Sequence, residues 1–286
     1  MSGNNPLQLI QLTDKEFDLL SSLVYNQFGI KLGLDKKVLL STRLQKVLKN
    51  LGLDNFEDYY HHLRKDKTGK ALSALANRIS TNHTFFYREP AHFELLSSTV
   101  LPEIIAKHRS ISSKDLRVWC AASSSGEEPY MLMMLLMEAL GSEYKQWSCG
   151  LLATDISETA LNTAKGGVYS KEQIEPLPEK FQSNYFKAMD EDSYSVIPEL
   201  KSEITYRRFN LMNTTLPFKK AFDVIFIRNV MIYFDASTKT ALVNRLKDFM
   251  NPGGYLFLGM AETLPKGVQG FEGVSPSVYR KKTSWV

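Results

Sequence analysis

Cysteine is nearly absent from this sequence. The 286 residues contain two, Cys120 and Cys149, and each lies beside an apolar stretch. Free cysteine is among the most frequently buried residue types, so we expect two buried thiols rather than a disulfide or a metal site. The five histidines show no metal-ligand spacing, and we therefore expect structural histidines and no metal: His61, His62, His83, His92 and His108.

Long apolar runs and a strong charge imbalance are also missing. No apolar run approaches the length of about 20 residues that a membrane span needs. Residues 1–6 lack the basic start and apolar core of a secretory signal. A formal net charge of +4 is too small to indicate nucleic-acid binding by itself. We expect a cytoplasmic protein without membrane insertion and without a nucleic-acid partner.

The first eighty or so residues are patterned as helices. Apolar residues recur at helical spacing over residues 14–27 and again over residues 35–51, where the expected buried stripe is Leu40, Leu44, Val47, Leu48 and Leu51. Asp54 and Glu57 have the spacing of a capping box that opens a third helix, and a fourth helix is expected over residues 71–79. The pattern predicts an all-α N-terminal domain.

From about Lys114 the pattern alternates between strands and helices. Expected strands are 116–121, 148–154, 222–227 and 254–258, and expected helices are 128–140, 158–164 and 237–250. This order predicts an α/β fold with an open, mostly parallel, doubly wound sheet that binds ligands at the carboxyl ends of its strands. Residues 166–210 interrupt the rhythm. There we expect a small antiparallel β insertion containing Ser193–Ile197 and Ile204–Phe209.

The connection AASSSGEEPY, residues 121–130, joins the first expected strand to the next helix. It holds one glycine, Gly126, whereas a pyrophosphate loop needs several, and Glu127 and Glu128 would repel a phosphate. Alternatively, these acids only interact favourably with the positive, N-terminal end of the helix dipole. The second strand ends at Asp155, a residue type that accepts both ribose hydroxyls but also caps helices. Together these residues favour a positively charged nucleoside such as S-adenosylmethionine.

Three segments resemble the CheR family of chemotaxis receptor methyltransferases. They are NHTFFYRE at residues 82–89, the loop at residues 121–130, and RNVMIYFD at residues 228–235. The similarity runs in order from about residue 13 to residue 282. It implies methyl transfer from S-adenosylmethionine to glutamate side chains of bacterial chemoreceptors in chemotactic signal transduction, with S-adenosylhomocysteine as product.

The resemblance also implies a domain organisation. Residues 1–81 would form a helical receptor-recognition domain, and residues 82–95 a linker that contributes to the cofactor site. Residues 96–286 would form a Rossmann-like methyltransferase domain with the β insertion. We expect a monomer whose partners are the cytoplasmic methylation helices of chemoreceptors.

The family pattern assigns roles to individual residues. Expected cofactor contacts are Asn82, Thr84, Arg88, Glu127, Glu128, Asp155, Asn210, Leu211, Arg228 and Asn229. Which of Glu127 and Glu128 lies nearer the methionine portion stays open. Arg88 and Tyr233 would face the methyl group and the incoming carboxylate as catalytic residues. The basic face of the second helix would bind the receptor, although a basic face needs no partner to be stable: Arg43, Lys46 and Lys49. We expect the neighbouring aromatic residues in the core: Phe85, Phe86 and Tyr87.

Residues 259–262 depart from the family pattern, because GMAE replaces the usual Gly-His-Ser-Glu. Any polar role of that histidine is therefore absent. Two alternatives stay open: a regulator that binds S-adenosylmethionine without catalysis, and a methyltransferase acting on another signalling protein. The presence of both Arg88 and Tyr233 favours an enzyme. An RNA methyltransferase would need a broad basic surface with exposed aromatic residues, which this charge balance does not suggest. The acids of the first loop disfavour a nicotinamide oxidoreductase.

Overall fold

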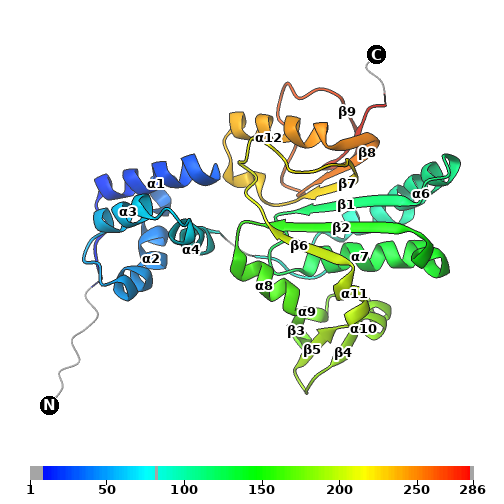
Figure 1. The fold of residues 1–286 in the computed structure, drawn as a ribbon, viewed down its shortest axis with the longest axis horizontal. Coiled ribbons are helices and arrows are strands. Elements are labelled where there is room, and N and C mark those ends of the chain that lie inside the picture. Colours follow the sequence, from blue (N-terminus) through cyan, green and yellow to red (C-terminus); the bar gives the residue numbers. More distant parts are fainter. Residues whose placement is uncertain (1–8, 81–82, 284–286) are drawn as a thin grey trace. The chain divides into compact units, whose positions relative to one another are not determined.

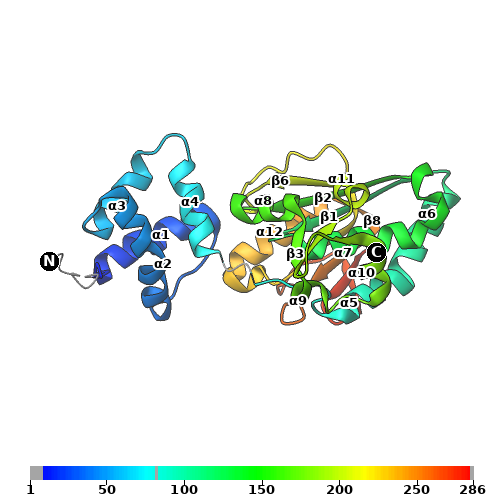
Figure 2. The same ribbon diagram turned by 90° about the horizontal axis from the view of Figure 1, so that it is seen from below.

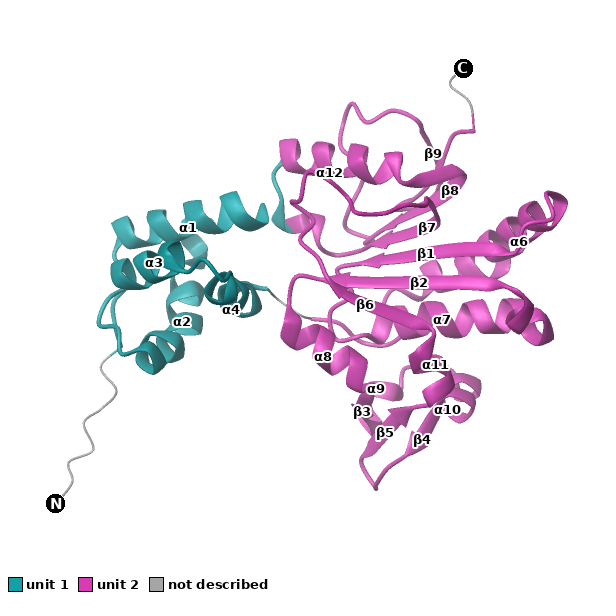
Figure 3. Cartoon of the chain, viewed as in Figure 1, with its two compact units in different colours: residues 1–81, 233–235 teal, residues 82–232, 236–286 magenta. Residues whose placement is uncertain are grey.

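A computed structural model of the chain describes residues 9–80 and 83–283. The chain forms two compact units (Figure 3). The helical unit comprises residues 1–81 together with the short segment 233–235, and the second unit, called the methyltransferase unit here after the resemblance described above, comprises residues 82–232 and 236–286. Each unit has buried apolar residues of its own.

Over residues 9–80 the helical unit contains four α-helices, which Figure 2 shows side by side: α1 (Asp14–Phe28), α2 (Lys37–Leu51), α3 (Phe56–Lys65) and α4 (Lys70–Ile79). A short 3-10 helix, η1 (Leu34–Lys36), precedes α2. The helices form because apolar residues recur on one face of each, and that face is buried. Helix α1 begins at a capping box between Thr13 and Glu16. The prediction of an all-α N-terminal domain is confirmed.

Two details of the helical unit differ from the prediction. Helix α3 is capped by Asn55, whose side chain accepts the Asp58 N–H at 2.8 Å, and not by Asp54. Both residues are good caps, and the extended backbone of Asn55 decides between them. Leu51 was expected in the buried stripe but is 43% exposed. It is the last residue of α2, directly before the left-handed cap Gly52.

The methyltransferase unit is built on a seven-stranded sheet of order β6-β2-β1-β7-β8-β10-β9 (Figure 1). Its strands are β1 (Asp115–Ala121), β2 (Ser148–Asp155), β6 (Ile204–Arg208), β7 (Phe222–Ile227), β8 (Met250–Leu258), β9 (Phe271–Ser275) and β10 (Val278–Lys281). The first five pair in parallel, and β10 pairs antiparallel with both β8 and β9. The mostly parallel α/β sheet is confirmed, while the terminal hairpin β9–β10 was not predicted.

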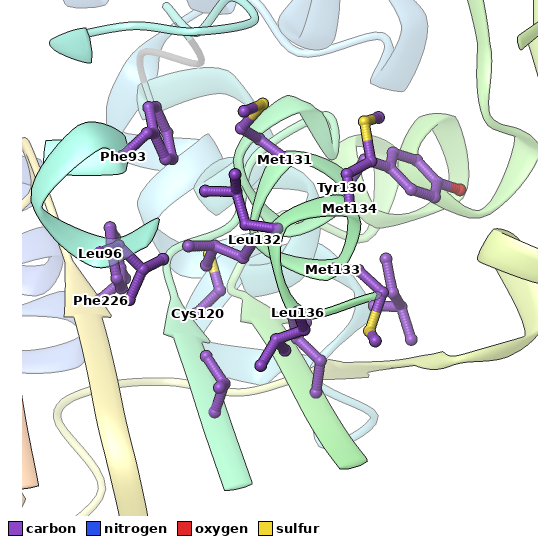
Figure 4. Packing of buried hydrophobic residues seen from close by; sticks show 14 of the residues in the cluster. Phe93, Leu96, Cys120, Tyr130, Met131, Leu132, Met133, Met134, Leu136 and Phe226 are labelled. Carbon is purple, nitrogen blue, oxygen red and sulfur yellow. The ribbon is translucent and has the colours of Figure 1, made fainter. Parts of the chain in front are cut away.

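Helices accompany the strands of this sheet: α5 (Pro90–Leu95), η2 (Leu96–Val100), α6 (Leu101–Ser110), α7 (Glu127–Leu140), η3 (Gly141–Gln146), α8 (Glu158–Gly166), η4 (Met231–Tyr233) and α12 (Ala236–Asp248). Helix α7 is central, because every residue from Pro129 to Leu136 is buried. Figure 4 shows its side chains packed with Cys120 of β1, Phe226 of β7 and Phe93 of α5. An apolar helix buried around its circumference fixes the position of the loop that precedes it.

A second, three-stranded sheet of order β3-β5-β4 forms the insertion. It consists of β3 (Val168–Ser170), β4 (Phe186–Ala188) and β5 (Ser193–Val196), accompanied by α9 (Lys171–Ile174), α10 (Glu179–Tyr185) and α11 (Pro198–Ser202). Figure 1 shows it beyond the β6 edge of the main sheet. The predicted antiparallel insertion is present. The assignment of Ile204–Phe209 to it is wrong, because β6 pairs in parallel with β2 in the main sheet.

Within the described ranges, none of the helices combines the length and the apolar character that crossing a membrane requires.

Candidate cofactor and acceptor site

The parallel strands of the main sheet end at one edge. Ala121 ends β1, Asp155 ends β2, Ile227 ends β7 and Leu258 ends β8. The register aligns them, since Ala121 lies opposite Thr154 and Ile227 opposite Leu258. Polar residues that follow these strands are therefore brought together at the carboxyl edge, which is where open α/β sheets bind ligands.

The loop between β1 and α7 has an unusual backbone. Ala122, Ser124 and Gly126 all have positive φ angles, of 65°, 48° and 104°. Only Gly126 is free of a side-chain penalty there, and a Cβ on it would lie 2.8 Å from both the Ala164 Cβ and the Tyr169 hydroxyl oxygen. The same hydroxyl donates to the Ser125 carbonyl at 2.7 Å. The single glycine is thus required by close packing, and the loop is held in place.

Asp155 is tied to this loop. Its carboxylate accepts the Ser124 N–H and the Ser157 N–H, both at 2.8 Å, and its side chain is largely buried. Burial raises the pKa of this carboxyl group, and the backbone N–H groups oppose the rise. The structure therefore places Asp155, the residue predicted to bind the ribose, directly beside the first loop.

Glu127 and Glu128 occupy different environments. Glu127 is 1% exposed and accepts hydrogen bonds from the Ser125 hydroxyl at 3.0 and 2.8 Å. Burial raises the pKa of Glu127, and the bond from Ser125 opposes the rise. Glu128 instead accepts the Arg228 guanidinium at 2.7 Å and the Cys120 thiol at 3.2 Å. The charge of Glu128 is therefore paired within the protein, while that of Glu127 is not paired with any described cation.

Arg228 follows β7 and joins two carboxylates. Its side chain is 1% exposed and donates to Glu128 and, at 3.0 Å, to Glu89. The guanidinium also lies over the Phe93 ring, 5.2 Å from its centroid. Asn229, in a left-handed conformation at φ 58°, donates its side-chain amide to Glu89 at 3.1 Å. The structure thus brings Arg228 to the first loop through Glu128, and both Arg228 and Asn229 to the segment before α5 through Glu89.

Glu89 and Glu262 are site residues to which the sequence analysis assigned no role. Burial raises the pKa of Glu89, but the bond from Asn229 and the charge of Arg228 outweigh it, so its pKa is lowered. Glu262 is 5% exposed and accepts the N–H groups of Asn229, Gly259 and Ile232 at 2.8, 2.7 and 3.1 Å. The sequence did contain a signal for Glu262, because this acid, in the segment GMAE, lies four residues after the end of an expected strand.

The remaining predicted cofactor residues are placed as follows. Thr84 and Arg88 are half-buried, and the Arg88 guanidinium donates to the His83 carbonyl at 2.6 Å. Asn210 accepts the Met212 N–H at 3.0 Å, and the buried Leu211 presents its carbonyl to Arg245 at 2.8 Å, so both lie in a fixed turn after β6. Asn82 lies outside the described residues.

The expectation that three adjacent aromatic residues lie in the core is correct for one of them. Phe86 is fully buried and packs edge-on against Tyr169 and Phe186. Phe85 is 43% exposed, which contradicts the prediction, and Tyr87 is half-buried. Phe85 has a favourable contact at the surface, because the Arg88 guanidinium lies 5.9 Å from its ring centroid and attracts the exposed aromatic face.

The other predicted residues belong to the helical unit. Tyr233 is half-buried, and its carbonyl accepts the Lys31 N–H at 3.0 Å. Lys46 and Lys49 are exposed on α2, as a docking face requires. Arg43 was expected on the same open face but is half-buried and donates to the Arg78 and Ile79 carbonyls at 3.3 and 3.0 Å. Because these carbonyls end helix α4, Arg43 has a structural role there.

The charge balance at the carboxyl edge suits a cationic ligand. Glu127 and Asp155 are buried carboxylates without an ion-pair partner among the described residues. The hydroxyls of Ser123 and Ser124 are buried there and have no hydrogen-bond partner in the described structure. A ligand with an amino group, a positive charge and a ribose diol would supply partners to all of these groups. The residues present therefore fit S-adenosylmethionine. No group of acidic, histidine or cysteine side chains among residues 9–80 and 83–283 could hold a metal ion.

Comparison with known proteins agrees with this arrangement. Residues 15–80 match the family model described as CheR methyltransferase, all-alpha domain, and residues 82–279 match CheR methyltransferase, SAM binding domain. A chemotaxis protein methyltransferase of Borreliella burgdorferi is 38% identical over 272 residues, which cover 95% of this chain and 96% of that protein. One from Escherichia coli is 34% identical over 256 residues, covering 88% and 86%. The chain therefore belongs to the CheR family of chemotaxis methyltransferases.

Proposed function

We propose that this protein transfers the methyl group of S-adenosylmethionine to glutamate side chains of chemoreceptors. The observation that carries the proposal is the match of both CheR domains along nearly the whole chain. The uncompensated carboxylates at the carboxyl edge support the choice of cofactor.

The proposed cofactor contacts follow from the placement of polar groups. Asp155 would accept the ribose hydroxyls, because it lies at the end of β2 beside the first loop. Glu127 would pair with the amino group of the cofactor, since its charge lacks a partner among the described residues, whereas Glu128 is already paired with Arg228. When bound, S-adenosylmethionine supplies a methyl group on a positively charged sulfur, and its transfer leaves neutral S-adenosylhomocysteine.

The acceptor requires little chemical help from the protein. A glutamate carboxylate has a reference pKa near 4.3, so it is an anionic nucleophile at neutral pH and needs no general base. One carboxylate oxygen forms the new bond to the methyl carbon, and the electron pair of the breaking carbon–sulfur bond remains on sulfur. The task of the enzyme is to align three atoms and exclude water, and such positioning contributes about 7–11 kcal/mol in favourable cases.

We propose that Arg88 orients the incoming carboxylate and that Tyr233 supports it. The Arg88 guanidinium makes a single hydrogen bond, to the His83 carbonyl, within the described residues, so donors remain for a bidentate carboxylate. The exposed Lys46 and Lys49 would attract acidic receptor helices and set their register. Arg43 does not belong to this proposed docking surface, because it is bound to helix α4.

The function is tested by incubating the protein and cofactor with the cytoplasmic fragment of a chemoreceptor from the same cell. Methyl esters are then mapped by mass spectrometry, and S-adenosylhomocysteine is quantified in parallel. The proposal predicts product that depends on the receptor and esters confined to glutamates. Product formed with another signalling protein but not with the receptor would establish a different acceptor. Cofactor binding without product in either case would establish a regulator.

A further inference from the structure

The helical unit contains a pocket of about 680 Å³ between α2, α3 and α4. Val47 of α2 and Ala74 of α4 contribute apolar surface to it, and the buried Tyr59 of α3 lies in its wall. Its volume lies within the range of about 300–1,000 Å³ that small-molecule sites occupy. None of the residues assigned above to methyl transfer or receptor docking lines this pocket.

Three cations line the same pocket: Lys65, Lys70 and Arg78. All three are exposed, and the described structure shows no salt bridge to any of them. The one carboxylate in the lining, Asp66, is engaged elsewhere, because it accepts the Thr68 hydroxyl at 2.6 Å and the Ala71 N–H at 2.7 Å. These hydrogen bonds, first among them the one from Thr68, lower the pKa of Asp66 to about 2. Asp66 is therefore ionised at neutral pH, but the three cations outnumber this one carboxylate. The lining of the pocket carries a net positive charge.

A polar group in this pocket lacks a partner. Tyr59 is 1% exposed, and its hydroxyl has no hydrogen-bond partner among the described residues. Burial raises the pKa of Tyr59 to about 12, although the nearby charge of Arg78 opposes the rise. A buried hydroxyl without a partner is unfavourable and is rare in folded proteins. An acceptor atom brought by a ligand would satisfy it once the hydroxyl turns toward the pocket.

We propose that the pocket binds a small organic anion with a flat apolar body. The body would pack on Val47, Tyr59 and Ala74, and the anionic group would accept hydrogen bonds from Tyr59 and Arg78 beside Lys65 and Lys70. A pocket of this volume, lined by three helices, favours a compact ligand over an acidic protein segment, which would contact a wider surface.

The test uses two probes that share one aromatic skeleton and differ in the presence of a sulfonate group. The full-length protein, saturated with S-adenosylhomocysteine to block the cofactor site, is titrated with 8-anilinonaphthalene-1-sulfonate and with its uncharged analogue N-phenyl-1-naphthylamine, and probe fluorescence is recorded. The proposal predicts that the sulfonate binds at least about tenfold more tightly. Arg78→Ala and Lys70→Ala should each weaken sulfonate binding about fivefold or more, since each removes a charge from the lining. Lys67→Ala, which removes an exposed cation outside the lining, should leave binding unchanged.

Tyr59→Phe separates a ligand role from a structural one. The variant removes the unpaired hydroxyl, so the midpoint of urea unfolding should rise, while sulfonate affinity should fall because a donor is lost. Unchanged affinity in Tyr59→Phe and in both charge variants would overturn the proposal, as would equal binding of the two probes. An octaglutamate peptide that binds through Lys70 and Arg78 where the sulfonate does not would also overturn it, in favour of an acidic protein segment. Far-UV circular dichroism shows that each variant is folded.

Discussion

Arg228 and Glu89 lie 139 residues apart in the chain, yet their side chains meet at 3.0 Å in the methyltransferase unit. The same guanidinium binds Glu128 at 2.7 Å, at the start of α7. One buried cation therefore joins the segment before α5, the first cofactor loop and the end of β7. Because Arg88 precedes Glu89 directly, this contact also fixes the backbone that carries the proposed catalytic arginine.

Removing Arg228 should destabilise the methyltransferase unit. Arg228→Ala leaves Glu89 and Glu128 without their cation, and breaking a buried ion pair in this way costs about 3–5 kcal/mol. Urea unfolding followed by tryptophan fluorescence measures the loss. Arg109→Ala is the matched control, because its partner Glu143 is about half exposed and such surface pairs contribute about 0–1 kcal/mol. Equal losses in the two variants would contradict the role given to Arg228.

Glu127→Gln should make the free protein less sensitive to pH. Burial raises the pKa of Glu127 above its ordinary value of 4.5, so the folded state holds this proton more tightly than the unfolded state. The contribution of Glu127 to stability is then greatest below pH 4.5 and falls as the pH rises through the raised pKa. Relative to the wild type, the variant should gain stability as the pH rises from 4.5 through the raised pKa, which thermal unfolding measures. Glu199→Gln, at an exposed carboxylate, should show no such gain.

The same substitution should weaken cofactor binding. If Glu127 pairs with the amino group of the cofactor, its loss should raise the Kd for S-adenosylhomocysteine by about tenfold, or 1.4 kcal/mol. Wild-type affinity should increase with pH as Glu127 ionises, and this increase should be smaller in the variant. Calorimetric titration at several pH values provides the comparison. A variant that binds as tightly as the wild type at every pH would remove Glu127 from the cofactor site.

Arg88→Ala should impair transfer far more than it impairs cofactor binding. Misplacing a reacting group by about 1 Å can cost about 100-fold in rate, so we expect a loss of that order in kcat/KM for the receptor. Arg88→Lys keeps the charge but lacks the planar fork that binds a carboxylate with two hydrogen bonds, and it should restore only part of the activity. An unchanged kcat/KM in a folded Arg88→Ala variant would show that the assignment is wrong.

Reversing the charge of Lys46 and Lys49 should weaken receptor methylation without affecting the cofactor. The double variant Lys46→Glu, Lys49→Glu should raise the KM for the receptor fragment about tenfold at low salt, and the difference should shrink at high salt because exposed charges are screened. The control is Lys165→Glu, Lys266→Glu, which changes the net charge equally at exposed positions of the methyltransferase unit. Equal effects of the two double variants would indicate general electrostatics rather than docking on α2.

The sequence predicted those elements whose local pattern decides their structure. The parallel strands follow from short apolar runs, and α7 follows from one long apolar run. The acids at the start of α7 and at the end of β2 mark the carboxyl edge of the sheet. Ile204–Phe209 was correctly expected to be extended, but its partner could not be predicted, because pairing with β2 depends on residues about 50 positions away. Strand propensity carries no information about which neighbour a strand pairs with.

Roles that depend on distant partners were missed for the same reason. Glu89 binds Arg228 and Asn229, and Glu262 binds three backbone N–H groups, two of them about 30 residues upstream. Arg43 has helical spacing typical of an exposed cation, yet the end of α4 binds it. A charged residue in a sequence does not show whether its partner is solvent, a ligand or a helix end. The packing of the folded chain decides that.

The central claim is the formation of a glutamyl methyl ester on a chemoreceptor. The most direct measurement supplies methyl-labelled S-adenosylmethionine and a receptor cytoplasmic fragment from the same cell, then treats the separated receptor with mild alkali and collects volatile methanol. We predict that the label joins the receptor and is released as methanol, because alkali hydrolyses carboxylate esters. Label that stays on the receptor after alkali, or no transfer despite tight binding of the cofactor, would contradict the claim.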